Sequence, residues 1–118
     1  MKKILIVEDD RLLNRTLTYN LVSEGYEVAS AGNVKGAESL LDSEEYDLIL
    51  LDINLPDGNG CHLCKRLKPA HPHTIVIFLT ANDQEKDQIK GYEAGAVDYI
   101  TKPFSILALQ RKIKAMFL

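Results

Sequence analysis

The chain has 118 residues, of which 46% are hydrophobic and 26% are charged, and this is the composition of one ordinary globular domain. Its two cysteines exclude a disulfide scaffold, and its apolar runs are too short for a membrane span or a secretory signal, so we expect a cytoplasmic protein without a membrane segment. The formal net charge of −3 and the lack of a basic patch with interleaved aromatic residues exclude direct nucleic-acid binding by this domain.

Short apolar runs alternate with helical patterns from the first residues onward. The first strand is predicted at residues 4–7, and the first helix follows Asp10, which can cap it, and ends before Gly25. A weaker strand at residues 27–31 leads to a second helix that Asn33 can cap. In both helices the apolar residues recur every three or four positions, which predicts one buried face for each.

The central run consists of four consecutive branched apolar residues, 48–51, and it ends abruptly in Asp52. A run of this kind, bounded by turn residues, is typical of a strand that is buried on both faces of a parallel sheet. A third helix is predicted from Gly58 to Lys68, and a rigid loop that contains two prolines follows it.

The last part of the chain continues the same alternation. A fourth strand is predicted at residues 75–79, a fourth helix from Asp83, a short strand at residues 97–100 and a last helix that Ser105 can cap. The alternation predicts an α/β fold, a doubly wound parallel sheet of five strands with helices on both faces. The order 2-1-3-4-5, flavodoxin-like, is common at this size and places the switch point between the first and third strands.

Polar residues follow the strands where the predicted sheet presents its carboxyl edge. Glu8 and Asp9 follow the first strand, Asp52 ends the third, Thr80 follows the fourth and Lys102 follows the fifth. Each has an ordinary structural explanation by itself, such as a satisfied strand-end hydroxyl or a solvated lysine. Together they predict a ligand site, because open α/β sheets bind their ligands at this edge.

Three carboxylates at one edge repel one another, by roughly 4 kcal/mol for two unit charges about 4 Å apart at an effective dielectric near 20. Their pKa values would rise unless a cation joined them. Carboxylates, a backbone carbonyl and water are ligands that Mg²⁺ prefers, and this ion usually leaves room for a phosphate. With Lys102 and Thr80 able to contact the same anion, the residues predict a phosphoryl site with Asp52 as nucleophile.

Four segments of the chain resemble the receiver domain of bacterial response regulators. They are IVEDD at residues 6–10, LLDINLPDG at 50–58, LTA at 79–81 and GAVDYITKPF at 95–104. The resemblance covers essentially residues 1–118 as one receiver domain. It is strongest to the receivers of winged-helix, OmpR/PhoB-type transcriptional regulators.

The resemblance implies that Asp52 accepts a phosphoryl group from a phosphohistidine on a sensor histidine kinase. It implies a Mg²⁺ ion held by Asp9, Asp52 and the main-chain carbonyl of Asn54, with Glu8 acting largely through water. The side chain of Asn54 would help to set how quickly water removes the phosphate. Such a domain catalyses only its own phosphorylation and dephosphorylation, so a conventional enzyme is not expected.

A two-state switch is also implied by the resemblance. Lys102 would pair with the phosphoryl group, and its bond to Pro103 is typically cis in such domains. The hydroxyl of Thr80 would move to a phosphate oxygen, and Tyr99 would rotate inward and repack the surface of the fourth helix, fifth strand and fifth helix. The resemblance also implies that Asn82, together with Asn54, tunes how quickly water removes the phosphate.

Related regulators often form phosphorylation-dependent homodimers through that surface, and they bind DNA through a C-terminal effector domain that would lie outside this chain. Asp98 stands at the acidic interface position, and Lys112 keeps a basic role. Gln88 and Ala108 stand where a basic and an acidic residue are expected. The interchain ion pairs of a homodimer therefore depart from the usual pattern.

Three other functions share parts of this pattern. Cys61 and Cys64, with His71 and His73 downstream, could form a redox or zinc site, but two buried helix cysteines explain the same spacing. A flavodoxin-like cofactor binder needs a phosphate loop after the first strand, where this chain has acids that repel phosphate. A haloacid-dehalogenase-like phosphatase needs a second acid two residues after its nucleophile, where this chain has Asn54.

Overall fold

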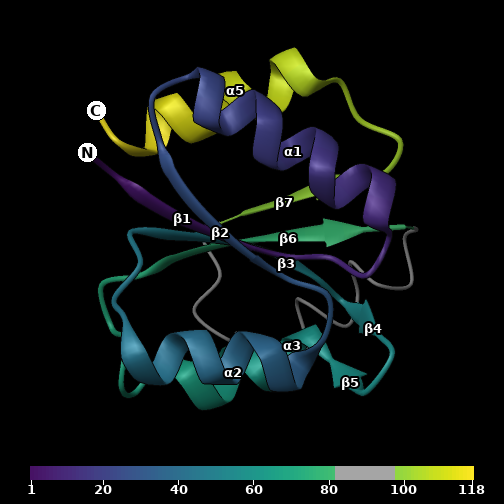
Figure 1. Ribbon diagram of the computed structural model, residues 1–118, viewed down its shortest axis with the longest axis vertical. Helices are drawn as coiled ribbons and strands as arrows, with labels where there is room; N and C mark the ends of the chain where they lie inside the picture. The colour runs from purple at the N-terminus through teal and green to yellow at the C-terminus, as the bar shows by residue number, and fades with distance from the viewer. Residues whose placement is uncertain (82–97) are drawn as a thin grey trace.

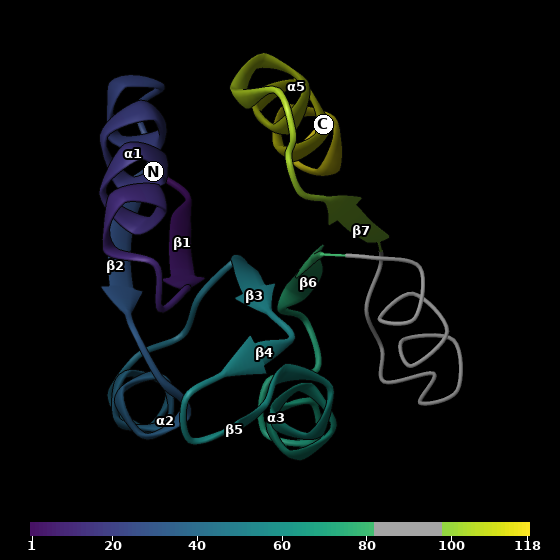
Figure 2. The ribbon, with the colours of Figure 1, turned by 90° about the vertical axis from the view of Figure 1, so that its right-hand side faces the viewer.

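A computed structural model describes residues 1–81 and 98–118 of the chain. Within these residues, a parallel sheet has two helices on each face (Figure 1). The helices α1 (Arg11–Ser23) and α5 (Ile106–Met116) cover one face, and α2 (Val34–Ser43) and α3 (Gly60–Leu67) cover the other (Figure 2). The fourth helix predicted from Asp83 lies outside the described residues.

The five strands of the main sheet run in the order predicted from the sequence. In space the order is β2-β1-β3-β6-β7, and every neighbouring pair is parallel. Their bounds are β1 (Lys3–Val7), β2 (Glu27–Ala31), β3 (Leu48–Asp52), β6 (Ile75–Thr80) and β7 (Asp98–Thr101). Since β1 and β3 are adjacent and the chain leaves them in opposite directions, the predicted switch point lies between them.

The central strands are buried on both faces, as their unbroken apolar runs predict. Alternate residues point to opposite faces, so that Leu5, Ile49 and Phe78 pack under α2 and α3. Ile4, Leu50 and their neighbours pack under α1 and α5. Burial of each such side chain stabilises the fold by about 1.5–3 kcal/mol, and the two cores together hold the strand ends in register.

Three predicted helix caps are confirmed. Asp10 accepts a hydrogen bond from the Leu13 N–H at 3.0 Å, and Asn33 accepts one from the Gly36 N–H at 2.7 Å. The Ser105 hydroxyl accepts a hydrogen bond from the Ala108 N–H at 3.2 Å in the same way. The predicted end of the first helix is also correct, because Gly25 has a φ of 95°, which glycine adopts without strain.

The predicted start of the third helix is wrong by two residues. Gly58 and Asn59 form a short strand, β5 (Gly58–Asn59), that pairs antiparallel with β4 (Asn54–Leu55). The helix begins at Gly60, because the Asn59 side chain accepts hydrogen bonds from the first N–H groups, including Cys61 at 2.7 Å. A hairpin of six residues therefore separates the end of β3 from α3.

The spacing of Ile106, Leu109, Ile113 and Phe117 predicts one buried apolar stripe on the last helix, and the structure buries only part of it. Leu109 and Ile113 of its apolar stripe are buried, whereas Ile106 and Phe117 are only partly buried, and Phe117 lies just beyond the helix. Phe117 packs against Tyr26, with ring centroids 5.7 Å apart, and the Lys2 ammonium lies 5.4 Å from the centre of the Phe117 ring. In residues 1–81 and 98–118, no helix has the length and apolar character that a membrane crossing requires.

Candidate functional site

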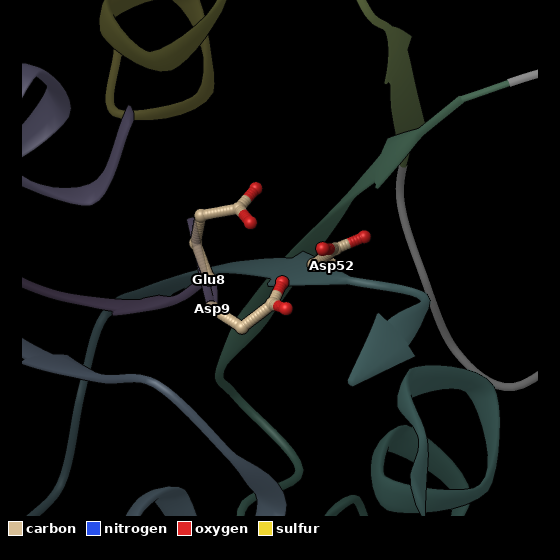
Figure 3. Close-up of side chains that lie close together, drawn as sticks. All are labelled: Glu8, Asp9 and Asp52. Atoms are coloured by element: carbon tan, nitrogen blue, oxygen red, sulfur yellow. The ribbon is translucent and has the colours of Figure 1, made fainter. Parts of the chain in front are cut away.

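Three carboxylates meet at the carboxyl edge of the sheet (Figure 3). Glu8 and Asp9 follow the last residue of β1, and Asp52 is the last residue of β3, the neighbouring strand. One oxygen of each carboxylate lies within 4.8 Å of an oxygen of the other two. Glu8 and Asp52 are buried, at 1% and 6% exposure, whereas Asp9 is exposed.

Lys102, which directly follows β7 at the end of the sheet, brings a positive charge to this cluster. Its Nζ lies 2.5 Å from Glu8 Oε1 and 3.4 Å from Asp52 Oδ2. Its main-chain N–H donates to the Thr80 carbonyl at 2.6 Å, and its bond to Pro103 is cis, as the family resemblance predicts. Burial lowers the pKa of Lys102, but the hydrogen bond to Glu8 and the two nearby carboxylates outweigh it and raise the pKa overall.

Asp52 carries the clearest sign of unbalanced charge. Burial, followed by the charge of Glu8, raises the pKa of Asp52 from 3.8 to about 7. The charge of Lys102 and a hydrogen bond from the Asn54 N–H, at 3.3 Å, act in the opposite direction without cancelling this rise. One lysine is therefore too little positive charge for three crowded acids.

A divalent cation fits this donor set. Among the residues that the structure describes, these three acids form the cluster of potential metal ligands, and all of their donor atoms are oxygens. Hard oxygen ligands of this kind suit Mg²⁺ rather than zinc. A cavity of about 590 Å³ opens beside Glu8 and Asp9, between the first turn of α1 and the start of α2.

Two neighbouring polar residues hold the turn that carries Glu8 and Asp9. The Asp10 N–H donates to Glu8 Oε2 at 3.0 Å, which orients the buried carboxylate. The Asn14 side-chain amide donates to the carbonyls of Glu8 and Ala31 at 2.9 and 3.3 Å, and so links the ends of β1 and β2. Sequence reasoning missed Asn14, although a poor helix former one turn inside a helix is a usable signal.

Thr80 lies at the end of β6, next to the strand of Asp52. In the register of the sheet, Leu79 pairs with Asp52, and Thr80 is the following residue. The Thr80 side chain is fully buried, and its hydroxyl has no hydrogen-bond partner in the described part of the chain. A buried hydroxyl without a partner is costly, so this one is available to a group that enters the site.

Tyr99 and Asp98 lie in β7, which is the last strand in the order of the sheet, at the end opposite β2. Tyr99, in β7, is half-buried and packs against the core under α2 and α3. Asp98 forms an ion pair with Lys112 of α5 in the same chain, at 2.5 Å. Ala108 is exposed on α5, and Asn82 and Gln88 lie outside the described residues.

The alternative site at Cys61 and Cys64 is not favoured by their surroundings. Both cysteines are buried in α3, as expected for core residues of a helix. Burial raises the pKa of the Cys64 thiol to about 11, which disfavours the thiolate that redox chemistry and zinc binding need. His71 is also buried, with Nδ1 3.4 Å from Glu45 Oε1.

Comparisons with known proteins agree on one family. The sequence matches the family model of the response regulator receiver domain over residues 4–114. The transcriptional regulatory protein PmrA of Pectobacterium parmentieri is 41% identical over 114 residues, which are 97% of this chain and 51% of that protein. The chain spans about half the length of the curated relatives it matches.

Solved structures agree at the level of the fold. The crystal structure of a two-component response regulator from Clostridium difficile superposes with a TM-score of 0.92 at 30% identity, covering 99% of this chain and 96% of that one. The response regulator TrrA of Thermotoga maritima, crystallised in complex with Mg²⁺-BeF, superposes with a TM-score of 0.87 at 30% identity, covering 98% of both chains.

Proposed function

Because this chain belongs to the response regulator receiver family, and is therefore a phosphorylation switch rather than a conventional enzyme, we propose that Asp52 is its phosphoacceptor and that a sensor histidine kinase is the donor. In this proposal residues 1–118 form one receiver domain. The observation that supports it best is the buried Asp52 carboxylate, which lies at the carboxyl end of a central strand among two further acids and one lysine.

Mg²⁺ is the proposed cofactor. Asp9, Asp52 and the main-chain carbonyl of Asn54 would hold it, and Glu8 would act through water. When bound, the ion supplies the positive charge that lets the acids stay ionised together and that offsets the charge of an incoming phosphoryl group. The binding of TrrA to Mg²⁺-BeF is a precedent in a protein of the same fold.

Lys102 and Thr80 would recognise the phosphoryl group once it is attached to Asp52. The ammonium of Lys102 already lies within 3.4 Å of the Asp52 carboxylate, so a small shift brings it to a phosphoryl oxygen. The hydroxyl of Thr80, which has no hydrogen-bond partner within the described residues, would donate to a phosphoryl oxygen in that state. A gain of one or two hydrogen bonds is modest, which suits two states in near balance.

The output of the switch would be a change in the surface around β7 and α5. Movement of Thr80 toward the phosphate leaves room for Tyr99 to rotate inward. A homodimer through this surface would have to replace the Asp98–Lys112 pair within one chain by contacts between chains. Asn54 and Asn82 would tune the phosphate lifetime.

The wider role would be control of transcription. PmrA is a transcriptional regulatory protein, and it is about twice as long as the segment that matches this chain. We propose that an effector domain that follows this chain binds DNA, and that the receiver itself does not. We also propose that the protein acts in the cytoplasm, where its kinase partner would phosphorylate it.

A labelling experiment tests the central step. The purified chain is incubated with an acyl phosphate and Mg²⁺, and the phosphorylated protein is detected by intact-mass spectrometry. We expect labelling of the wild type and of Asp42→Ala, a control that removes an exposed acid from α2, but no labelling of Asp52→Ala or in the presence of a chelator. Equal labelling of Asp52→Ala would overturn the assignment.

A further inference from the structure

Asp57 makes two hydrogen bonds to a helix that is distant from it in sequence. Its Oδ1 accepts from the Val34 N–H at 2.7 Å, and its Oδ2 accepts from the Lys35 N–H at 3.0 Å. These hydrogen bonds lower the pKa of the Asp57 carboxyl, the bond from Val34 first. A carboxylate at a helix N-terminus also interacts favourably with the helix dipole.

The first turn of α2 is capped by two side chains from two different elements. Asn33, directly before the helix, takes the third N–H, that of Gly36. Asp57 accepts hydrogen bonds from the first two N–H groups of the helix, and it lies in the turn between β4 and β5. One cap is therefore local, whereas the other attaches the β4–β5 hairpin to α2.

The other end of the same hairpin is attached to the acidic cluster. The Asn54 N–H donates to Asp52 Oδ1 at 3.3 Å, and the Gly60 N–H donates to the Ile53 carbonyl at 2.7 Å. A Cβ on Gly60 would lie 2.2 Å from the Asp52 carbonyl oxygen, so the chain can return this close to β3 only with glycine at this position.

The hairpin is short, and its two attachments leave it little freedom. β4 and β5 have two residues each, and both lie on the α2/α3 side of the sheet (Figure 2). A Cβ on Gly58 would lie 3.0 Å from Val34 Cγ2, so the hairpin packs closely against the start of α2. Two hydrogen-bonded pairs alone would not hold such a hairpin in one place.

We propose that Asp57 is a positioning residue for the phosphorylation site: it fastens the β4–β5 hairpin to α2 and thereby sets the main chain at Asn54. This inference rests on the proposed metal site, since the Asn54 carbonyl is one of the proposed ligands. A hairpin released from α2 moves this carbonyl, although no proposed metal ligand is changed.

The chain offers a matched control for the test. Asp57→Ala and Asn33→Ala each remove a cap from the same helix end, so both lower the unfolding midpoint. Only Asp57→Ala detaches the hairpin. Asp57→Asn keeps one acceptor oxygen and is a milder variant of the same change, which folds even where full removal of the side chain does not.

The measured quantity is the Mg²⁺ dissociation constant of each variant, by isothermal titration calorimetry. We expect Asp57→Ala to weaken Mg²⁺ binding by about three- to tenfold, toward the lower end of what outer partners of metal ligands contribute. Asp57→Asn should have a smaller effect, and Asn33→Ala should bind as the wild type does. In metal-free protein, the amide hydrogens of Asn54 and Gly60 should exchange faster in both Asp57 variants than in the wild type, but not faster in Asn33→Ala.

The outcomes separate this inference from the proposed function. Absence of Mg²⁺ binding to the wild type, or unchanged binding to Asp9→Asn, would overturn the metal site itself. Two other outcomes would overturn only the positioning role of Asp57. In the first, Asp57→Ala binds Mg²⁺ as tightly as the wild type does. In the second, Asn33→Ala weakens Mg²⁺ binding as much as Asp57→Ala does.

Discussion

The two edges of the parallel sheet handle charge in opposite ways. At the amino edge, Lys3 pairs with Glu27 and Glu44 at 3.6 and 3.2 Å, and both acids keep at least half of their side-chain surface exposed. Water already solvates these groups, so their attraction is weak and their presence costs little. The Lys3 ion pairs at the amino edge are therefore solvated by water and do not need a ligand to balance them.

The carboxyl edge buries its charges and leaves them unbalanced. The side chains of Glu8 and Asp52 are only 1% and 8% exposed, and both carboxylates contact the ammonium of Lys102. Burial of acids that lack sufficient positive charge costs stability, and the raised pKa of Asp52 reflects that cost. This contrast indicates that the carboxyl edge suits a cationic ligand, because a divalent cation would supply the positive charge that the three acids lack.

The largest test of this contrast is Asp52→Asn, which removes a buried charge and keeps the side-chain shape. The pKa of Asp52 rises from 3.8 to about 7 on folding, so the folded state binds the extra proton and stability falls as pH rises between these values. Asn cannot ionise, so the variant should not show this fall. In chelator at about pH 8, we expect Asp52→Asn to be about 2–4 kcal/mol more stable than the wild type.

Urea unfolding in chelator, at about pH 5 and about pH 8, measures the effect. Asp42→Asn, which changes an exposed acid on α2, is the control and should follow the wild type at both values. Mg²⁺ should raise the stability of the wild type more than that of Asp52→Asn. If Asp52→Asn lost as much stability as the wild type between about pH 5 and about pH 8, ionisation of Asp52 would not be what destabilises the carboxyl edge.

The next effect in size is expected for Lys102→Met, which keeps the apolar stem and removes the charge. Glu8 and Asp52 then lose their cation, and removal of one partner of a fully buried pair costs 3–5 kcal/mol. Because Lys102 is 25% exposed, we expect a loss of about 2–3 kcal/mol at about pH 8. The loss should be smaller at about pH 5, where Asp52 is protonated.

Lys112→Met provides the comparison for that prediction. It breaks the pair with Asp98, in which both side chains are about one-third exposed, and it lies away from the acidic cluster. Unfolding curves of the two variants should differ clearly, with the smaller loss in Lys112→Met. Equal losses would show that burial at the carboxyl edge adds nothing to the strength of its ion pairs.

A smaller effect, of opposite sign, is expected for Thr80→Val. The substitution replaces a buried hydroxyl that has no hydrogen-bond partner among residues 1–81 and 98–118 by a methyl group of similar size, so the free energy of unfolding should rise by about 1 kcal/mol. Thr74→Val is the matched control, because the buried Thr74 hydroxyl donates to the Tyr46 carbonyl at 2.8 Å. That variant should lose about 1 kcal/mol in the same unfolding measurement. A loss in both variants would show that the Thr80 hydroxyl is already satisfied.

Most of the fold could be predicted because its signals are local. Apolar runs gave the strands, and the caps at Asp10, Asn33 and Ser105 marked helix starts within a few residues of sequence. The strand order followed from the alternation of strands and helices, and it brought together residues as distant as Glu8 and Lys102. The cis bond and the set of metal ligands came instead from the family resemblance.

The hairpin after Asp52 could not be predicted in the same way. Its turn residues suit a helix start as well as a hairpin, and the choice depends on how Asn59 caps α3. The contact of Asp57 with Val34 joins residues 23 positions apart, and nothing local in the sequence indicates it. Interactions that depend on how two loops meet in space carry no periodic signal.

The smallest effect is expected at the amino edge, for Lys3→Gln. The substitution removes the ion pairs with Glu27 and Glu44 but leaves the main-chain N–H of Lys3 on Asp47, at 2.7 Å. Exposed pairs contribute little, so the urea midpoint should fall only slightly, less than for any other variant named above, and the difference should shrink further at high salt. A loss as large as that of Lys102→Met would contradict this comparison. The exposed ion pairs of the amino edge would then stabilise the fold as much as the buried pairs of the carboxyl edge, and burial would not explain the difference between the two edges.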